Sequence, residues 1–205
     1  MDAEQGAVSN PFGMDENCRN CPGLCDERET VVHGYGDVGA EFLFVAERPG
    51  SEADRTGIPF DDNDRFWSML TELSLATLDG DDPILDNAYV THLTRCRHPE
   101  RPPTDDEVMS CEPFLNAEIR MINPEILIPI GQRALVEIGR EYTTTREDEL
   151  DIREHHGASI RGRGFELVPM IHPEEATTDD RDTFIEAFRE LTSRDYRQTK
   201  GRQQR

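Results

Sequence analysis

The sequence has 205 residues and a formal net charge of −21, with 43 acidic side chains against 22 basic ones. It is long enough for one domain with a substantial core, and it contains no apolar run of the length that a membrane-spanning helix requires. The acidic balance argues against long-range attraction to nucleic acid.

The basic residues are almost all arginine, and Lys200 is the only lysine. Such a surface suggests adaptation to high cytoplasmic salt. In molar salt the Debye length falls to about 3 Å, so repulsion from DNA is weak. A local groove that carries arginine can then still bind DNA, with base stacking and shape supplying more of the affinity.

Residues 1–17 are polar and contain glycine and proline, so they are predicted to form an irregular N-terminal arm. They lack the basic and apolar regions of a signal peptide, which favours a cytoplasmic protein. In that reducing compartment, five cysteines more often bind a metal or take part in catalysis than form disulfides.

Three of the cysteines lie close together, and two follow far downstream. Cys18 and Cys21 form a C-x2-C pair that can direct two thiolates at one metal centre, although a redox pair has the same spacing. Cys25 is the candidate spare thiol, and spacing does not exclude it as a substitute for Cys21. With Cys96 and Cys111, three arrangements remain open: four ligands plus a spare, a zinc site, or unrelated buried thiols.

An apolar stretch at 41–46 is predicted to be a buried strand that ends at the Pro-Gly turn of 49–50. Glu47 and Arg48 lie at this break, and Phe60 follows the same loop. Open α/β sheets keep their sites at such carboxyl ends. The competing interpretation is a strand, a turn and a surface ion pair.

A helix over 64–75, capped by Asp64, follows from apolar positions at helical spacing. Trp67 lies on this stripe and is assigned to the core rather than to a base-stacking role. A second strand at 88–93 carries His92 toward Cys96.

Prolines stiffen the next loop, and a capping box at 104–107 begins a predicted helix over 105–122. A third strand at 125–130 has the continuous apolar run of a parallel strand buried on both faces. It stops at Gly131, where another helix begins.

The acidic stretch 141–155 is predicted to be an exposed excursion, and 157–164 to be a turn or a loop that contacts phosphate. A fourth strand at 165–171 ends at His172. Asp179-Asp180 is the predicted cap of a final helix, and 196–205 is the predicted disordered tail.

Alternating strands and helices predict an α/β fold, a three-layer sandwich with a central four-stranded, mostly parallel sheet flanked by helices, within one domain over 18–195. The strand ends that carry Glu47, His92, Gly131 and His172 are expected at one edge of this sheet. A cleft is expected there.

Several motifs together resemble the uracil-DNA glycosylase superfamily, most closely its iron–sulfur family 4, over roughly residues 18–192. The matching pieces are Cys18-x2-Cys21, Ala46-Glu47-Arg48-Pro49-Gly50, Gly57-Ile58-Pro59-Phe60, Arg95-Cys96-Arg97, Cys111-x-Pro113-Phe114-Leu115, Asn123-Pro124-Glu125 and His172-Pro173. Each is weak alone, but their order and spacing make a strong signal. The salt-adapted composition is that of a haloarchaeal member.

The resemblance implies a [4Fe–4S] cluster held by Cys18, Cys21, Cys96 and Cys111 as a structural staple. It also implies a catalytic carboxylate, Glu47, that orients or activates water, and a catalytic histidine, His172, that donates to uracil O2. The implied substrate-binding residues are Phe60, which stacks on the extruded base, together with Arg48, Ala46, Gly50 and His92.

The chain departs from the family pattern at three of these positions. His92 stands where the family has an asparagine that reads the Watson–Crick edge, Ala46 replaces a glycine, and Arg48 replaces a small residue. The segment after Pro173 lacks an apolar wedge for the duplex, which favours single-stranded DNA.

The resulting hypothesis is a monomeric DNA glycosylase that hydrolyses the N-glycosidic bond of uracil or a related deaminated base in base excision repair. The alternative is an inactive member that binds nucleic acid and keeps the iron–sulfur cluster. A zinc-bound nucleic-acid module is a third interpretation.

Overall fold

The structure, a computed structural model, describes residues 8–80, 82–194 and 196. Most of the predicted disordered tail and the first part of the predicted arm therefore lie outside the described residues. In the described part of the arm, Ser9 forms a β-bridge with Tyr35, and the Phe12 side chain is buried against Tyr89.

A mostly parallel sheet forms the centre of the molecule, in the order β1-β5-β2-β6-β8-β7. Its strands are β1 (Tyr35–Gly36), β2 (Phe42–Ala46), β5 (Ala88–His92), β6 (Ile126–Pro129), β7 (Ile160–Arg161) and β8 (Glu166–Leu167). Strands β5, β2, β6 and β8 are parallel to one another, whereas β1 and β7 are antiparallel edges. The α/β sandwich with a mostly parallel sheet is confirmed.

The predicted number of four strands is wrong, because the sheet has six. The four predicted strands are its parallel members. The two further strands are only two residues long and carry glycine or arginine, so they show no alternation of apolar and polar residues that a pattern could detect.

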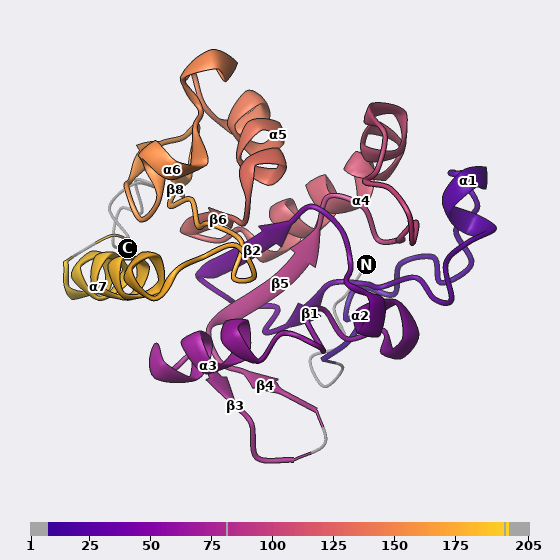
Figure 1. Ribbon diagram of the computed structural model, residues 1–205, viewed down its shortest axis with the longest axis horizontal. Coiled ribbons are helices and arrows are strands. Elements are labelled where there is room, and N and C mark those ends of the chain that lie inside the picture. Colours follow the sequence, from indigo (N-terminus) through magenta and orange to yellow (C-terminus); the bar gives the residue numbers. More distant parts are fainter. Residues whose placement is uncertain (1–7, 81, 195, 197–205) are drawn as a thin grey trace, which may run out of the picture.

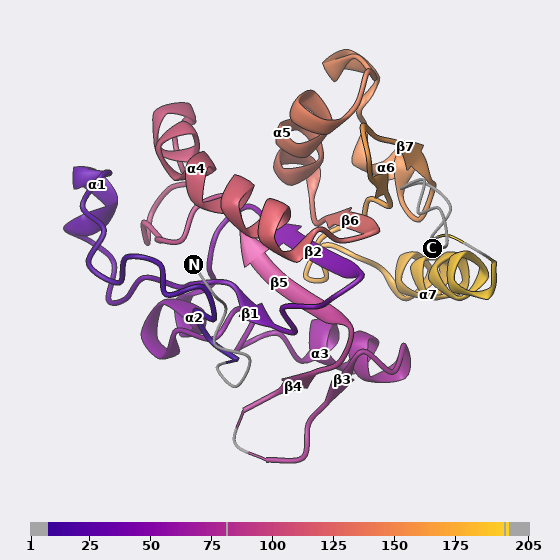
Figure 2. The ribbon, with the colours of Figure 1, turned by 180° about the vertical axis from the view of Figure 1, so that it is seen from behind.

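Helices cover both faces of the sheet (Figures 1 and 2). One core cluster joins the sheet to α3 (Asp64–Glu72) and α7 (Thr178–Ser193). A second cluster joins the opposite face to α4 (Asp105–Ile122) and α5 (Gln132–Tyr142). Every residue of β2 is therefore buried, which explains its continuous apolar sequence.

Short elements fill the connections, and the sequence did not predict them. They are α1 (Pro22–Cys25), α2 (Ser51–Thr56), η1 (Glu147–Glu149), α6 (Ile152–His155) and a two-stranded sheet of β3 (Ala76–Thr77) and β4 (Ile84–Leu85). Within the described residues, no helix is long and apolar enough to cross a bilayer.

Two predicted helix caps are one or two residues away from the observed ones. Asn63, not Asp64, caps α3 by accepting from the Phe66 N–H. Thr177, not Asp179-Asp180, caps α7 in a reciprocal box with Asp180. In both cases the cap is the polar residue just before the acidic first turn, as the geometry of a helix N-terminus requires.

Candidate active site

A cavity of about 320 Å³ opens where β2 and β5 end. Six of the predicted site residues line it: Glu47, Arg48, Gly50, Phe60, His92 and His172. Ala46 does not, because its side chain is buried in the core. The lining also includes residues that were not among the predicted site residues, namely Pro49, Asp62, Asn63, Arg97, Glu174 and Glu175. We call this cavity the strand-end cleft.

Phe60 holds its ring in the strand-end cleft through an unusual backbone conformation. Its φ is +59°, in the left-handed region that bulky residues rarely adopt. The Trp67 indole N–H donates to the Phe60 carbonyl at 2.8 Å, and the Asn63 N–H donates to the same oxygen at 2.9 Å. The Phe60 ring stacks on the Phe66 ring, with the two ring centroids 4.0 Å apart. Trp67 is thus a core residue, and its indole also fixes the backbone of Phe60, which lines the strand-end cleft.

Two imidazoles flank the Phe60 ring. The ring centroid of His92 lies 5.8 Å from that of Phe60 at an interplanar angle of 18°, and His172 lies at 6.0 Å and 27°. Burial, followed by electrostatic interactions with His172 and Arg95, lowers the pKa of His92 to about 3. His92 is therefore neutral at physiological pH.

The loop that carries His172 is held from two sides. Arg65 on α3 donates to the carbonyls of Pro173 and Ala176, at 3.3 and 3.2 Å. The Ile171 N–H donates to Nδ1 of His156 at 3.0 Å. The Glu174 N–H approaches Nδ1 of His172 at 3.4 Å, so the hydrogen-bond pattern assigns the proton of His172 to Nε2.

Gly131 brings the end of β6 next to the same loop. Its N–H donates to the Met170 carbonyl at 2.8 Å, and a Cβ built on Gly131 would lie 3.8 Å from Cβ of His172. Its φ of +84° favours glycine at this strand-to-helix turn. The predicted convergence of Glu47, His92, Gly131 and His172 at one sheet edge agrees with this geometry.

Glu47 and Arg48 diverge from each other. Glu47 is half-buried and lines the strand-end cleft at the end of β2. The Arg48 guanidinium donates through Nη1 to the carbonyls of His98, at 3.0 Å, and Arg101. Arg48 therefore ties the proline loop to the cleft instead of directing that nitrogen at a ligand.

The five cysteines gather at one side of α4. In the described residues, no group of three or more ligand side chains has the convergence that a single metal ion needs. Electrostatic coupling nevertheless links them: burial raises the pKa of the Cys111 thiol to about 12, with further raising contributions from the charges of Cys96 and Cys21. The charges of Cys18 and Cys25 act on Cys96 in the same sense.

Cysteine thiolates are the ligands of iron–sulfur clusters and of many structural zinc sites, so the chemistry of this donor set suits either group. Hydrogen-bond donors stabilise the thiolate form of two of these cysteines. Arg28 Nη1 donates to Cys96 Sγ at 3.0 Å, and a hydrogen bond from the backbone of Arg95 lowers the pKa of Cys111.

A buried polar network lies between the cysteines and the strand-end cleft. Arg95 Nη2 approaches Glu118 Oε1 at 2.8 Å, and the two side chains are 4% and 2% exposed. Thr91 and Tyr89 donate to the same carboxylate at 2.8 and 3.3 Å. The guanidinium also stacks over Phe114, 4.8 Å from the ring centroid.

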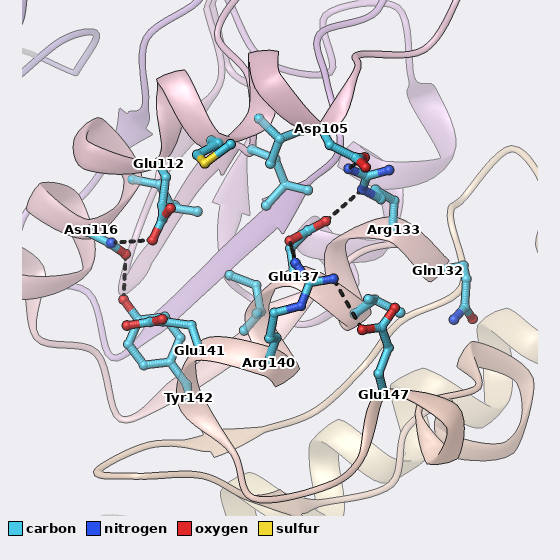
Figure 3. A pocket seen from close by; sticks show the side chains of 16 residues that line it. Asp105, Glu112, Asn116, Gln132, Arg133, Glu137, Arg140, Glu141, Tyr142 and Glu147 are labelled. Carbon is cyan, nitrogen blue, oxygen red and sulfur yellow. Dashed lines mark hydrogen bonds and ion pairs between the residues drawn. The ribbon is translucent and has the colours of Figure 1, made fainter.

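A second cavity, of about 620 Å³, lies between α4 and α5 and contains none of the predicted site residues (Figure 3). Its charged rim is internally paired, since Arg133 bonds Asp105 and Arg140 bonds Glu147. The predicted catalytic residues, Glu47 and His172, line the smaller strand-end cleft instead.

Comparisons with known proteins agree with the motifs. The profile described as "Uracil DNA glycosylase superfamily" matches residues 33–192. The chain is 37% identical over 167 residues to a type-4 uracil-DNA glycosylase of Thermotoga maritima, covering 77% of each chain. It is 29% identical over 180 residues to a type-4 enzyme of Saccharolobus solfataricus, covering 85% of this chain and 80% of the relative. A type-5 uracil-DNA glycosylase of Thermus thermophilus is 32% identical over 144 residues, which is 58% of this chain and 65% of the relative.

Proposed function

This chain belongs to the uracil-DNA glycosylase superfamily, and we propose that it removes uracil from DNA by hydrolysing the N-glycosidic bond in base excision repair. The observation that carries this proposal is the shared strand-end cleft, which Glu47, Phe60 and His172 all line. Glu47 and Phe60 come from one stretch of the sequence, and His172 lies more than a hundred positions later. Together they supply a carboxylate, an aromatic ring and an N–H donor around one space.

Cleavage of the N-glycosidic bond leaves an oxocarbenium-like sugar and a uracil that carries negative charge. His172, with its proton assigned to Nε2, donates to uracil O2 as that charge develops. Phe60 stacks on the extruded base. The hydrogen bond from Trp67 to its carbonyl and the stack on Phe66 hold the ring in position when the base enters. His172 and Phe60 therefore both act on the departing base.

The half-exposed Glu47 acts on the other side of the reaction. A carboxylate that keeps access to solvent can hold and activate the water that attacks the sugar. Its backbone is fixed, because the Thr94 N–H donates to the Glu47 carbonyl at 3.1 Å. The assignments of Glu47 and His172 as catalytic residues rest on this geometry and on the family resemblance.

The residues at the mouth of the strand-end cleft favour single-stranded DNA as the substrate and activity at high salt. Glu174 and Glu175 lie on the lining where an apolar wedge would otherwise part a duplex, and Arg97 supplies a cation. Their repulsion of phosphates is screened within about 3 Å in molar salt. We therefore assign to the protein a monomeric, salt-adapted form that acts on uracil in single-stranded DNA.

The test is excision from a single-stranded oligonucleotide that contains one uracil, in molar potassium chloride, followed by alkaline cleavage of abasic sites. We expect strand breaks at the uracil position only, and slower cleavage when the uracil is paired in a duplex. Binding of the oligonucleotide without any breaks would favour the alternative, an inactive nucleic-acid-binding member whose departures at His92 and Arg48 have removed catalysis.

Cys18, Cys21, Cys96 and Cys111 are the proposed ligands of a [4Fe–4S] cluster. When bound, the cluster supplies cross-links among the segment that leads into α1, the loop after β5 and α4, not chemistry at the base. Within this chain, Arg28 offsets the negative charge of the thiolates, and Arg48 and the proline loop join this region to the strand-end cleft.

Replacing Cys96 with alanine is expected to abolish iron binding and to lower the thermal unfolding midpoint, because a buried ligand is lost. Cys25→Ala is the matched control and is expected to keep the full iron content. Iron per chain and the visible absorption band, brown for iron–sulfur and absent for zinc, provide the measurement. Iron loss in Cys25→Ala with retention in Cys96→Ala would contradict the ligand assignment.

A further inference from the structure

His92 has a ring nitrogen with no partner. Its side chain is only 2% exposed, and it lines the strand-end cleft. Within the part of the chain that the structure describes, Nδ1 is enclosed by protein and has no hydrogen-bonding partner. This leaves Nε2 as the nitrogen that can meet a base in the cleft.

The tautomer of His92 follows from the cost of burying each form of Nδ1. The ring is neutral, because burial lowers the pKa to about 3. A buried N–H without an acceptor is rarer in folded proteins than a buried acceptor that lacks a donor. The proton of His92 is therefore on Nε2, and the residue presents a donor to the strand-end cleft.

The other uncharged polar groups in the strand-end cleft also present donors. His172 receives the Glu174 N–H at Nδ1 and so donates from Nε2. The side-chain carbonyl of Asn63 is engaged by the Phe66 N–H at 3.0 Å, which leaves its amino group. The side-chain acceptors among the lining residues are carboxylates, such as Glu47 and Asp62.

We infer that the strand-end cleft selects nucleobases by two carbonyl oxygens, one at His172 and one at His92, on either side of the ring nitrogen between them. The substrate class is 2,4-dioxopyrimidines and 2,6-dioxopurines, represented by uracil and xanthine. Hypoxanthine lacks the second carbonyl, and cytosine brings an amino group to the His92 donor. This inference rests on the proposed glycosylase activity and specifies its substrates.

The first experiment measures single-turnover excision from single-stranded oligonucleotides that contain uracil, xanthine, hypoxanthine or cytosine. We expect uracil and xanthine to be removed, and hypoxanthine to be removed at least about tenfold more slowly than xanthine, since one charge-stabilising donor lacks its acceptor. Equal rates for hypoxanthine and xanthine would overturn the inference.

Two substitutions isolate the His92 contact. His92→Phe keeps an aromatic ring but removes the donor, so uracil and xanthine excision should both fall about tenfold or more. His92→Asn keeps a donor and adds a carbonyl for the ring N–H of the base, so uracil excision should be maintained or rise. Circular dichroism and thermal unfolding establish that both variants fold. A folded His92→Phe variant with wild-type rates would reject the assignment.

A readout independent of activity is the nitrogen-15 NMR spectrum of the histidine rings, with His92 assigned by its absence in His92→Asn. We expect the shifts of a neutral ring protonated at Nε2, and protonation at Nδ1 would overturn the inference. If no base is excised, the proposed function fails. If uracil is excised but the tautomer or the hypoxanthine result is the opposite, only the two-carbonyl inference fails.

Discussion

Replacing His172 with alanine is expected to slow uracil excision by about 30- to 1000-fold, which corresponds to about 2–4 kcal/mol of barrier for one charge-stabilising donor. The donor acts mainly in the transition state, because O2 of the bound base carries little charge until the bond to the sugar breaks. Oligonucleotide affinity should therefore change far less than the rate. Single-turnover rates at saturating enzyme, together with the oligonucleotide dissociation constant, measure the two effects.

A histidine outside the strand-end cleft provides the control. His155 lies on α6, where its Nε2 contacts the Glu149 carbonyl at 2.8 Å. His155→Ala should excise uracil at the wild-type rate. If His172→Ala were equally unimpaired, the donor role of His172 would be rejected.

The strands β2, β5 and β6 were predictable because every one of their residues is buried. Residues 41–46 and 125–130 show continuous apolar runs, and their carboxyl ends meet at one sheet edge as a consequence of parallel pairing. This reasoning placed Glu47, His92 and His172 near one another. The edge strands were not predictable, since two-residue pairings depend on neighbours that only the fold brings together.

The conformations inside the strand-end cleft could not be predicted from the sequence. Nothing in the residue types requires Phe60 to adopt a positive φ, because that conformation is fixed by the indole of Trp67 from the next helix. Likewise, Arg48 was assigned to substrate binding, but the carbonyls that engage its guanidinium belong to a loop about fifty positions away. Such contacts depend on tertiary geometry that a motif does not record.

The buried ion pair was also absent from the sequence prediction. In the sequence, Arg95 is a neighbour of Cys96, and Glu118 is one of several acidic residues in the predicted helix 105–122. Their pairing gives Arg95 a structural role between the two sites, since Thr91, which binds the same carboxylate, immediately precedes His92. Charges with such low exposure are retained only when they are paired.

Glu118→Ala is accordingly expected to destabilise the protein by about 3–5 kcal/mol, because it leaves the Arg95 charge buried without its partner. The free energy of unfolding from denaturant titration measures the loss. Replacing both residues together, as Arg95→Met with Glu118→Leu, should recover most of it, because the unpaired charge is then absent. A double variant no more stable than Glu118→Ala would contradict this explanation.

The effect of salt on the free energy of unfolding distinguishes the buried pair from an ordinary surface pair. Arg146 and Asp148 are 72% and 66% exposed, so Asp148→Ala should change the free energy of unfolding by no more than about 0.5 kcal/mol. That small effect should vanish in molar salt, where the Debye length is about 3 Å. The penalty of Glu118→Ala should persist there, because ions do not reach Arg95. A penalty that salt removed would mean that solvent and ions reach Arg95 and that the pair is not buried in solution.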